Sequence, residues 1–180
     1  FRQSVLIAYG TVRESSAIQV EAASGLQVNY TNYIFELSHV YRGSADGPIT
    51  VRVEGGIAGG RNEIYEPTAE LKDGKEYLLF LFQPNHGGNY YVDDDAYYVL
   101  GLNQGTFEPA DGGYISQSGA TLSEKTLLAR AEEFPLDPDY FRREFLQNQQ
   151  SNLDNGFITQ AEYDTLIADV DVYAQIVATE

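Results

Sequence analysis

The sequence predicts a mainly β protein with a helical C-terminal tail, and three observations carry this prediction. Apolar and polar residues alternate with a period of two over residues 30–41 and 49–54, as in half-buried strands. A Lys-Asp-Gly turn signal at 72–74 precedes the apolar run EYLLFLF at 76–82, which is typical of a buried central strand. After residue 120 the period lengthens to about 3.6, which favours helices. We therefore expect a small antiparallel β-barrel followed by a C-terminal helical hairpin.

The first two strands come from the N-terminal part of the chain. Residues 4–12 are strongly apolar and are interrupted at Gly10, which indicates a bulge or a sharp coil. Residues 13–25 are small and polar, so we expect a loop or a weak hairpin end there. In the second strand, the alternation directs one set of side chains toward the core, namely Tyr33, Phe35, Leu37, His39 and Tyr41.

The third strand, at residues 49–54, alternates without error. Its predicted inward side chains are Ile49, Val51 and Val53, and its outward ones are Thr50, Arg52 and Glu54. Glycines at 55, 56, 59 and 60 then loosen the chain, and Pro67 argues against a long helix before the central strand. Short strands are expected at 89–92 and 96–102, and a loop is expected at 103–119.

The predicted helices lie in residues 121–180. Thr121-Leu-Ser-Glu124 offers a helix cap, and the apolar stripe that follows it is stopped by Pro135. Asp137-Pro138 restarts a helix, and Thr159-Gln-Ala-Glu162 is a capping box for the last one. We therefore divide the chain into a barrel, residues 1–120, and a tail of two to three helices, residues 121–180, which packs on the barrel or on a partner.

Composition excludes several classes of function. The formal net charge is −16, and so acidic a surface repels nucleic acid and anionic lipid. The chain has no cysteine, so disulfides, thiolate metal sites and cysteine nucleophiles are excluded. No apolar run is long enough to span a bilayer, so we expect no direct membrane insertion. Because there is no Met, we expect Phe1 to follow a removed signal or lipoprotein segment, as in a secreted or cell-surface bacterial protein.

The order of the predicted strands resembles a known family. YTNYIFELSHVYRG, ITVRVEGG, LKDGKEYLLFLF and GLNQGTF follow one another as in the netrin-like domain, the OB-fold barrel of tissue inhibitors of metalloproteinases and of uncharacterised exported bacterial proteins. The most specific pieces are residues 74–81 and 41–43, and the resemblance covers residues 4–107. It implies an OB-like barrel and a protease-inhibitor-like role. In the animal inhibitors an N-terminal Cys contacts the catalytic zinc, and that mechanism does not carry over to a chain without cysteine.

A tyrosine-rich hairpin is the candidate ligand site. In an OB-fold the loop between the fourth and fifth strands borders the ligand face. Tyrosine rings together with Asn and Asp hydrogen bonds suit a sugar or an extended peptide. The alternative is that alternate tyrosines fill the interior of the barrel. The candidate ligand-binding residues are His86, Asn89, Tyr90, Tyr91, Tyr97 and Tyr98.

Two acidic segments have features of calcium sites. Asp93, Asp94 and Asp95 at the hairpin tip can offer hard oxygen ligands to Ca²⁺, and the alternative is a solvated turn. Residues 151–162 have the length of an EF-hand loop, but Ser and Leu stand where its first and third ligands belong. We therefore interpret that segment as a helix–turn–helix, and we expect no other cofactor.

The sequence shows no catalytic set. The two histidines, His39 and His86, are far apart, no serine sits in a nucleophile elbow, and no glycine pair precedes a Lys-Ser/Thr dipeptide. For His39 a structural role on the strand is favoured over that of a catalytic base. We therefore expect a non-catalytic exported or cell-surface binding module with a protein or glycan partner. The alternatives are a protease-inhibitor-like barrel and a tail-mediated structural or oligomerisation module.

Overall fold

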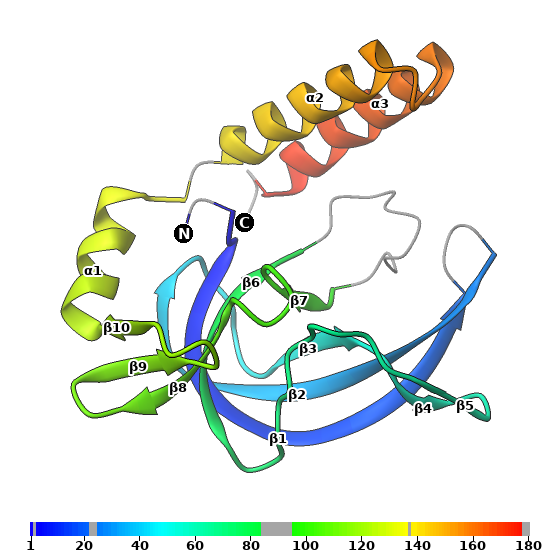
Figure 1. The fold of residues 1–180 in the computed structure, drawn as a ribbon. Coiled ribbons are helices and arrows are strands. Elements are labelled where there is room, and N and C mark those ends of the chain that lie inside the picture. Colours follow the sequence, from blue (N-terminus) through cyan, green and yellow to red (C-terminus); the bar gives the residue numbers. More distant parts are fainter. Residues whose placement is uncertain (2, 22–24, 84–94, 137, 178–180) are drawn as a thin grey trace.

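The computed structural model describes residues 1, 3–21, 25–83, 95–136 and 138–177 (Figure 1). Its larger sheet contains β1 Leu6–Glu21, β2 Gln27–Arg42, β3 Ile49–Glu54, β6 Glu76–Phe82, β7 Tyr97–Val99, β8 Thr106–Ala110, β9 Gly113–Ser116 and β10 Thr121–Ser123. The strand order in this eight-stranded sheet is β1-β2-β3-β7-β6-β8-β9-β10. A separate two-stranded sheet pairs β4 Gly56–Ala58 with β5 Arg61–Glu63. The prediction of a mainly β protein is confirmed.

Five of the strands close into a ring. β1 pairs antiparallel with β2 along most of its length, and its first residues also pair antiparallel with β6, where Leu6 lies opposite Leu81. The β2–β3 and β6–β7 pairs are antiparallel, whereas β3 and β7 run parallel, with Val51 opposite Tyr97. The ring order is therefore β1-β2-β3-β7-β6, and β8, β9 and β10 extend the sheet beyond β6.

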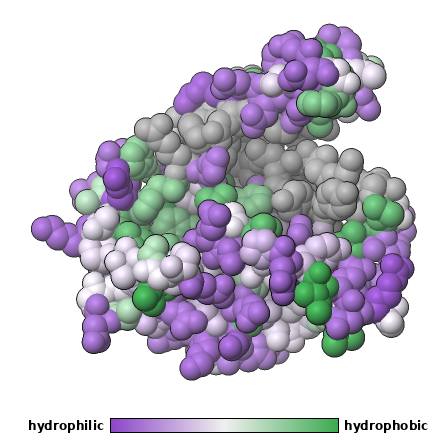
Figure 2. Space-filling view, in the orientation of Figure 1, coloured by the Kyte–Doolittle hydropathy of each residue, from purple (hydrophilic) through white to green (hydrophobic). Residues whose placement is uncertain are grey.

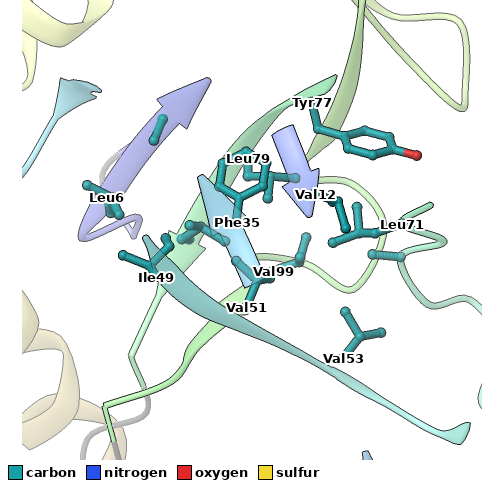
Figure 3. Close-up of a cluster of buried hydrophobic side chains, with 13 residues drawn as sticks. Leu6, Val12, Phe35, Ile49, Val51, Val53, Leu71, Tyr77, Leu79 and Val99 are labelled. Atoms are coloured by element: carbon teal, nitrogen blue, oxygen red, sulfur yellow. The ribbon is translucent and has the colours of Figure 1, made fainter. Parts of the chain in front are cut away.

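β6 lies at the centre of the sheet, as its apolar sequence predicts. Every residue from Tyr77 to Leu81 is buried, and β6 pairs with β1, β7 and β8. Because successive side chains of a strand point to opposite faces, β6 supplies two separate cores. Leu79 joins Phe35 and other side chains from all five ring strands in the interior of the ring (Figure 3). Leu78 packs on the outer face with Leu127.

β2 changes face within its length, which corrects one expectation. A register shift interrupts the β1–β2 ladder beside Tyr9. Such a bulge moves the side chains that follow it to the other face of the sheet. Phe35 faces the core as predicted, but Val40 packs there in place of His39 and Tyr41. His39 is exposed, and Tyr41 packs in the cluster on the outer face.

A segment expected as a loop or a weak hairpin end, and a second one expected as a loop, both contain strands. Residues 13–21 continue β1 although most of their side chains are exposed, because the backbone ladder with β2 runs on to Glu21. Residues 106–116 form the β8–β9 hairpin, which pairs with β6 through Phe107. Polar strands of this kind lack the apolar alternation on which strand prediction depends.

The glycines at 55–60 build a tight hairpin where the sequence suggests a loose connector. Gly59 and Gly60 form the two-residue turn between β4 and β5, with φ angles of 56° and 76°. Positive φ at both central residues is the requirement of a type I′ hairpin turn, which glycine meets without a steric penalty. The buried side-chain amide of Asn29 ties the hairpin to the ring, donating to three of its carbonyl oxygens at 3.0 to 3.3 Å.

The described helices follow the sheet, with bounds α1 Glu124–Glu133, α2 Pro138–Asp154 and α3 Gln160–Val177. The sheet continues through β10 to Ser123, three residues past the expected boundary, and Leu127 of α1 is buried against it. α2 and α3 lie side by side (Figure 1), so the prediction of C-terminal helices is confirmed. The capping box of α3 forms, with Glu162 accepting a hydrogen bond from the Thr159 backbone N–H at 2.7 Å. None of the helices described is both long and apolar enough to cross a membrane.

Arg42 joins three parts of the chain at the end of β2. Its buried guanidinium donates to the carbonyl oxygens of Phe1 and Ser4 through Nη1, and to that of Pro135, after α1, through Nη2. Burial lowers the pKa of Arg42 from its ordinary value. This arginine therefore fixes the segment after α1 beside the first residues of the ring.

Candidate functional site

The structure describes only part of the predicted tyrosine hairpin. His86, Asn89, Tyr90, Tyr91, Asp93 and Asp94 lie outside the described residues. Asp95 is exposed, and its backbone carbonyl accepts a hydrogen bond from Gln83 Nε2 at 3.4 Å. Tyr97 is half-buried against the core inside the ring, and Tyr98 is buried. The ligand-binding and calcium roles of this hairpin stay predictions.

Tyr98 packs against a buried arginine. Arg52 of β3 points away from the interior of the ring, as predicted, yet Arg52 is only 5% exposed. Its guanidinium carbon lies 5.6 Å from the centre of the Tyr30 ring and 5.9 Å from that of the Tyr98 ring. Arg52 Nε donates to Asn32 Oδ1 at 2.8 Å, and Nη1 donates to the Tyr98 hydroxyl at 3.3 Å. Cation–π contacts and hydrogen bonds therefore hold both side chains in one position.

Arg52 and Tyr98 line a pocket of about 210 Å³, which we call the Arg52–Tyr98 pocket. The rings of Phe82 and Tyr98, with centres 5.9 Å apart, supply aromatic surface. Thr68 and Glu54 add a hydroxyl and a carboxyl group, and burial raises the pKa of Glu54 above its ordinary value. The full lining is Arg52, Val53, Glu54, Thr68, Phe82, Tyr98, Val99, Gly101 and Leu102.

Leu102, in the lining of this pocket, has an unusual backbone. Its φ angle is 64°, in the left-handed region, and its side chain is 47% exposed. Outside glycine this conformation costs about 1–3 kcal/mol and persists only where the surrounding structure imposes it. Such strain concentrates at functional sites, so Leu102 marks this pocket as a candidate.

A second, larger cleft lies beside β2. It encloses about 340 Å³ between residues 36–40 of β2 and the segment that returns to β3, with Ala45, Gly47 and Pro48 on the far wall. The carboxylate of Glu36 at this cleft pairs with Arg13 on β1. His39, the described histidine, is part of the cleft wall.

An aromatic cluster on the outer face is satisfied by its own hydrogen bonds. The hydroxyl oxygens of Tyr41 and Tyr114 lie 2.7 Å apart, and the Tyr41 hydroxyl donates to Glu124 Oε1 at 3.3 Å. Burial, the bond to Tyr114 and the nearby Glu124 raise the pKa of Tyr41 far above its usual range. The ring of Tyr9 packs 5.7 Å from that of Tyr114. This cluster therefore fastens β9 and α1 to the ring.

The described part of the chain brings no acid, base or metal-binding set together. His39 is exposed, and its ring centre lies 4.4 Å from that of Tyr41. Within the described residues, no three His, Asp or Glu side chains gather where they could hold a metal ion. His86 lies outside those residues.

Sequence reasoning found one member of the Arg52–Tyr98 pocket, Tyr98 itself. Glu54, Thr68, Phe82 and Leu102 come from four separate segments, and no spacing motif joins them. Alternation directs Arg52 outward but cannot show that Tyr30 and Tyr98 cover it. The pairing of strands distant in the sequence, which alternation does not specify, creates this pocket.

The chain matches no protein-family model, no curated protein and no solved structure. The netrin-like resemblance therefore rests on the sequence motifs alone.

Proposed function

We propose that this protein is a non-catalytic binding module, exported or at the cell surface, that holds a sugar residue of a glycan in the Arg52–Tyr98 pocket. The observation that carries the proposal is the combination of aromatic wall, fixed polar groups and backbone strain at one pocket. Binding sites of this kind are concave, largely preformed and lined by apolar surface with a few polar groups that set orientation.

The chemistry of the lining favours a sugar over an apolar ligand. A sugar ring presents C–H groups that stack on aromatic faces and hydroxyls that need hydrogen-bond partners. Phe82 and Tyr98 offer such faces, while Thr68 and Glu54 offer hydroxyl and carboxyl oxygens. The formal charge of −16 disfavours anionic glycans, so the ligand is a neutral or basic sugar.

We further propose that the five-stranded ring is an OB-like barrel. The order β1-β2-β3-β7-β6, with β1 joined again to β6, supports this assignment, because the OB-fold is a five-stranded, partly open barrel. In chain order β3 is the third strand of the ring, and it supplies Arg52, Val53 and Glu54 to the pocket; the third strand of an OB-fold belongs to the face that binds oligosaccharides.

The proposal is tested with a glycan array followed by calorimetric titration of the glycans that bind. We expect Leu102→Asn and Thr68→Val to weaken binding about tenfold or more, since one removes a pocket wall and the other a hydroxyl. Asparagine tolerates the left-handed conformation, so Leu102→Asn is expected to fold at least as stably as the parent protein. The control is Leu128→Asn, because Leu128 is also 47% exposed but lies on α1.

The binding of the three variants distinguishes a glycan in this pocket from one bound elsewhere. Weakened binding in the two pocket variants with unchanged binding in Leu128→Asn supports the pocket. Binding that all three variants retain places the glycan elsewhere and overturns the site. No bound glycan on an array of neutral and basic sugars overturns the proposed ligand class.

A further inference from the structure

The second half of β2 has a strand partner on one side only. β1 pairs with β2 along its whole length, up to Arg42, whereas β3 pairs with it only over residues 30–35. The chain returns along the other edge of residues 36–40 through residues 43–48. Within the described residues, no backbone hydrogen bond joins this returning segment to residues 36–40. This stretch of β2 is therefore an open strand edge inside the sheet.

The shape of the cleft agrees with an open edge. Its β2 wall consists of five consecutive residues, 36–40, rather than alternate ones. Alternate residues line the face of a strand, so a consecutive series indicates that the cleft looks onto the edge, where backbone N–H and C=O groups point outward. At about 340 Å³ the cleft is large enough to admit more than a single water molecule.

The returning segment does not have the conformation of a strand that could close this edge. Gly43 and Gly47 have φ angles of 82° and 76°, which no extended strand contains. Pro48, which follows, has no N–H to donate. At Gly43, a side chain would collide with the carbonyl oxygen of Val5, just before β1, so the turn packs closely on the start of that strand. In the conformation that Gly43, Gly47 and Pro48 adopt, the returning segment leaves the edge open.

We propose that this cleft binds an extended, basic peptide segment of a protein partner, which adds to β2 as a further strand. Backbone hydrogen bonds to the open edge would supply affinity, as in other complexes formed by strand addition. The far wall of Ala45 and Pro48 leaves room for small or apolar side chains. Exposed Asp46, beside that wall, and the net charge of −16 favour lysine and arginine in the partner.

Charge also decides between a partner and a second copy of this chain. Open strand edges commonly pair with one another, which leads to self-association. Two copies that each carry −16 repel one another, so edge-to-edge pairing of this chain is disfavoured. The peptide site shares no lining residue with the Arg52–Tyr98 pocket. The peptide proposal therefore does not depend on the proposed glycan ligand.

The test uses the full chain and a random library of short linear peptides displayed on phage. Peptides that bind are expected to be rich in Lys and Arg, and their affinity is expected to fall as salt rises. Ser38→Arg, which fills the cleft mouth and adds a cation, should weaken the selected peptides about tenfold or more. The control is Ser44→Arg, the same change at an exposed serine outside the cleft lining.

Amide hydrogen exchange distinguishes strand addition from binding by side chains alone. Bound peptide should slow exchange at those amides of residues 36–40 that point away from β1, because they gain acceptors. Equal binding to the Ser38→Arg and Ser44→Arg variants, or enrichment of no peptide, would overturn the proposal. Protection of these amides by protein concentration alone, with dimers in light scattering, would show that a second copy occupies the edge and would also overturn it.

Discussion

At the scale of single residues, Asn29 does more for the architecture than its polar side chain suggests. The residue is fully buried, and every polar group of its side chain is bonded. Its Oδ1 accepts from Gln19 Nε2 at 3.0 Å, and its backbone N–H donates to Glu63 Oε2 at 3.0 Å. A buried amide that is fully satisfied in this way fixes one arrangement of the strands around it.

We therefore predict that Asn29→Ala lowers stability by at least about 2 kcal/mol, because the packing of a fully buried side chain is lost and three hairpin carbonyls lose their donor. For a chain of this size the melting temperature should fall by about 4–8 °C. Thermal unfolding followed by circular dichroism measures the change, and hydrogen exchange should show earlier opening of β4 and β5. Asn62→Ala in β5 is the matched control, because Asn62 is exposed. Equal melting temperatures for the two variants would contradict this role of Asn29.

The carboxyl group of Glu54 makes the stability of the folded protein depend on pH. Burial raises the pKa of this carboxyl in the folded protein above its unfolded value. The folded state therefore binds the proton more tightly, and stability falls as pH rises from the unfolded pKa through the folded one. Above the folded pKa the charged form carries the full cost of burial, whereas below the unfolded pKa of about 4.5 the cost is absent.

Accordingly, Glu54→Gln should be more stable than the parent protein at pH 7, and the difference should shrink toward zero as the pH falls below about 4.5. Urea unfolding at a series of pH values measures this difference. Removing any one negative charge also reduces repulsion in a chain of −16, so exposed Glu132→Gln provides the comparison. A pH profile of Glu54→Gln that matches that of Glu132→Gln would mean that burial of Glu54 carries no cost.

At the scale of elements, apolar patterning predicted the strands that build the core. β3 and β6 occur at residues 49–54 and 76–82, where alternation and the Lys-Asp-Gly turn place them. The full length of β1 was not predicted, because most side chains of residues 13–21 are exposed. Backbone pairing with β2 continues to Glu21, and Ile18 and Val20 pack against a core cluster. Sequence periodicity reports burial and carries no information on which distant segment supplies a hydrogen-bonding partner.

The error at His39 and Tyr41 has a different physical origin. Alternation assumes an unbroken ladder, and a single bulge reverses the side-chain phase from that point onward. Neither residue type reveals the bulge, since Ser38 and its neighbours are ordinary strand residues. The bulged half of β2 also borders the peptide cleft. The bulge that reverses the side-chain alternation is therefore part of a candidate site.

At the scale of the whole molecule, acidic residues outnumber basic ones. Hydrophilic atoms cover most of the face seen in Figure 2, with hydrophobic patches between them. This distribution agrees with the excess of 27 acidic over 11 basic residues. Association with a basic partner would therefore be accelerated at low ionic strength and slowed by salt, whichever of the two candidate sites is occupied.

β10 and α1 pack against the strands of the sheet, so their removal tests where the ring unit ends. Leu127 of α1 is fully buried on the outer face of the sheet, and β10 pairs with β9 at Leu122 and Tyr114. A chain that ends at residue 120 loses both contacts, whereas one that ends at Leu136 keeps them together with the bond from Arg42 to the Pro135 carbonyl.

We expect the chain ending at Leu136 to unfold cooperatively near the temperature of the full protein. The chain ending at residue 120 should unfold at least about 5 °C lower, because removal of a buried leucine alone costs about 2–5 kcal/mol. Differential scanning calorimetry compares the two, and Leu127→Ala in the full chain isolates the contribution of α1 packing. Should both shortened chains unfold at the same temperature, β10 and α1 would contribute nothing to the stability of the ring. The unit would then end at residue 120, as the sequence predicts. A lower temperature for the shorter chain alone instead assigns β10 and α1 to the ring unit and leaves the α2–α3 hairpin as an appendage to it.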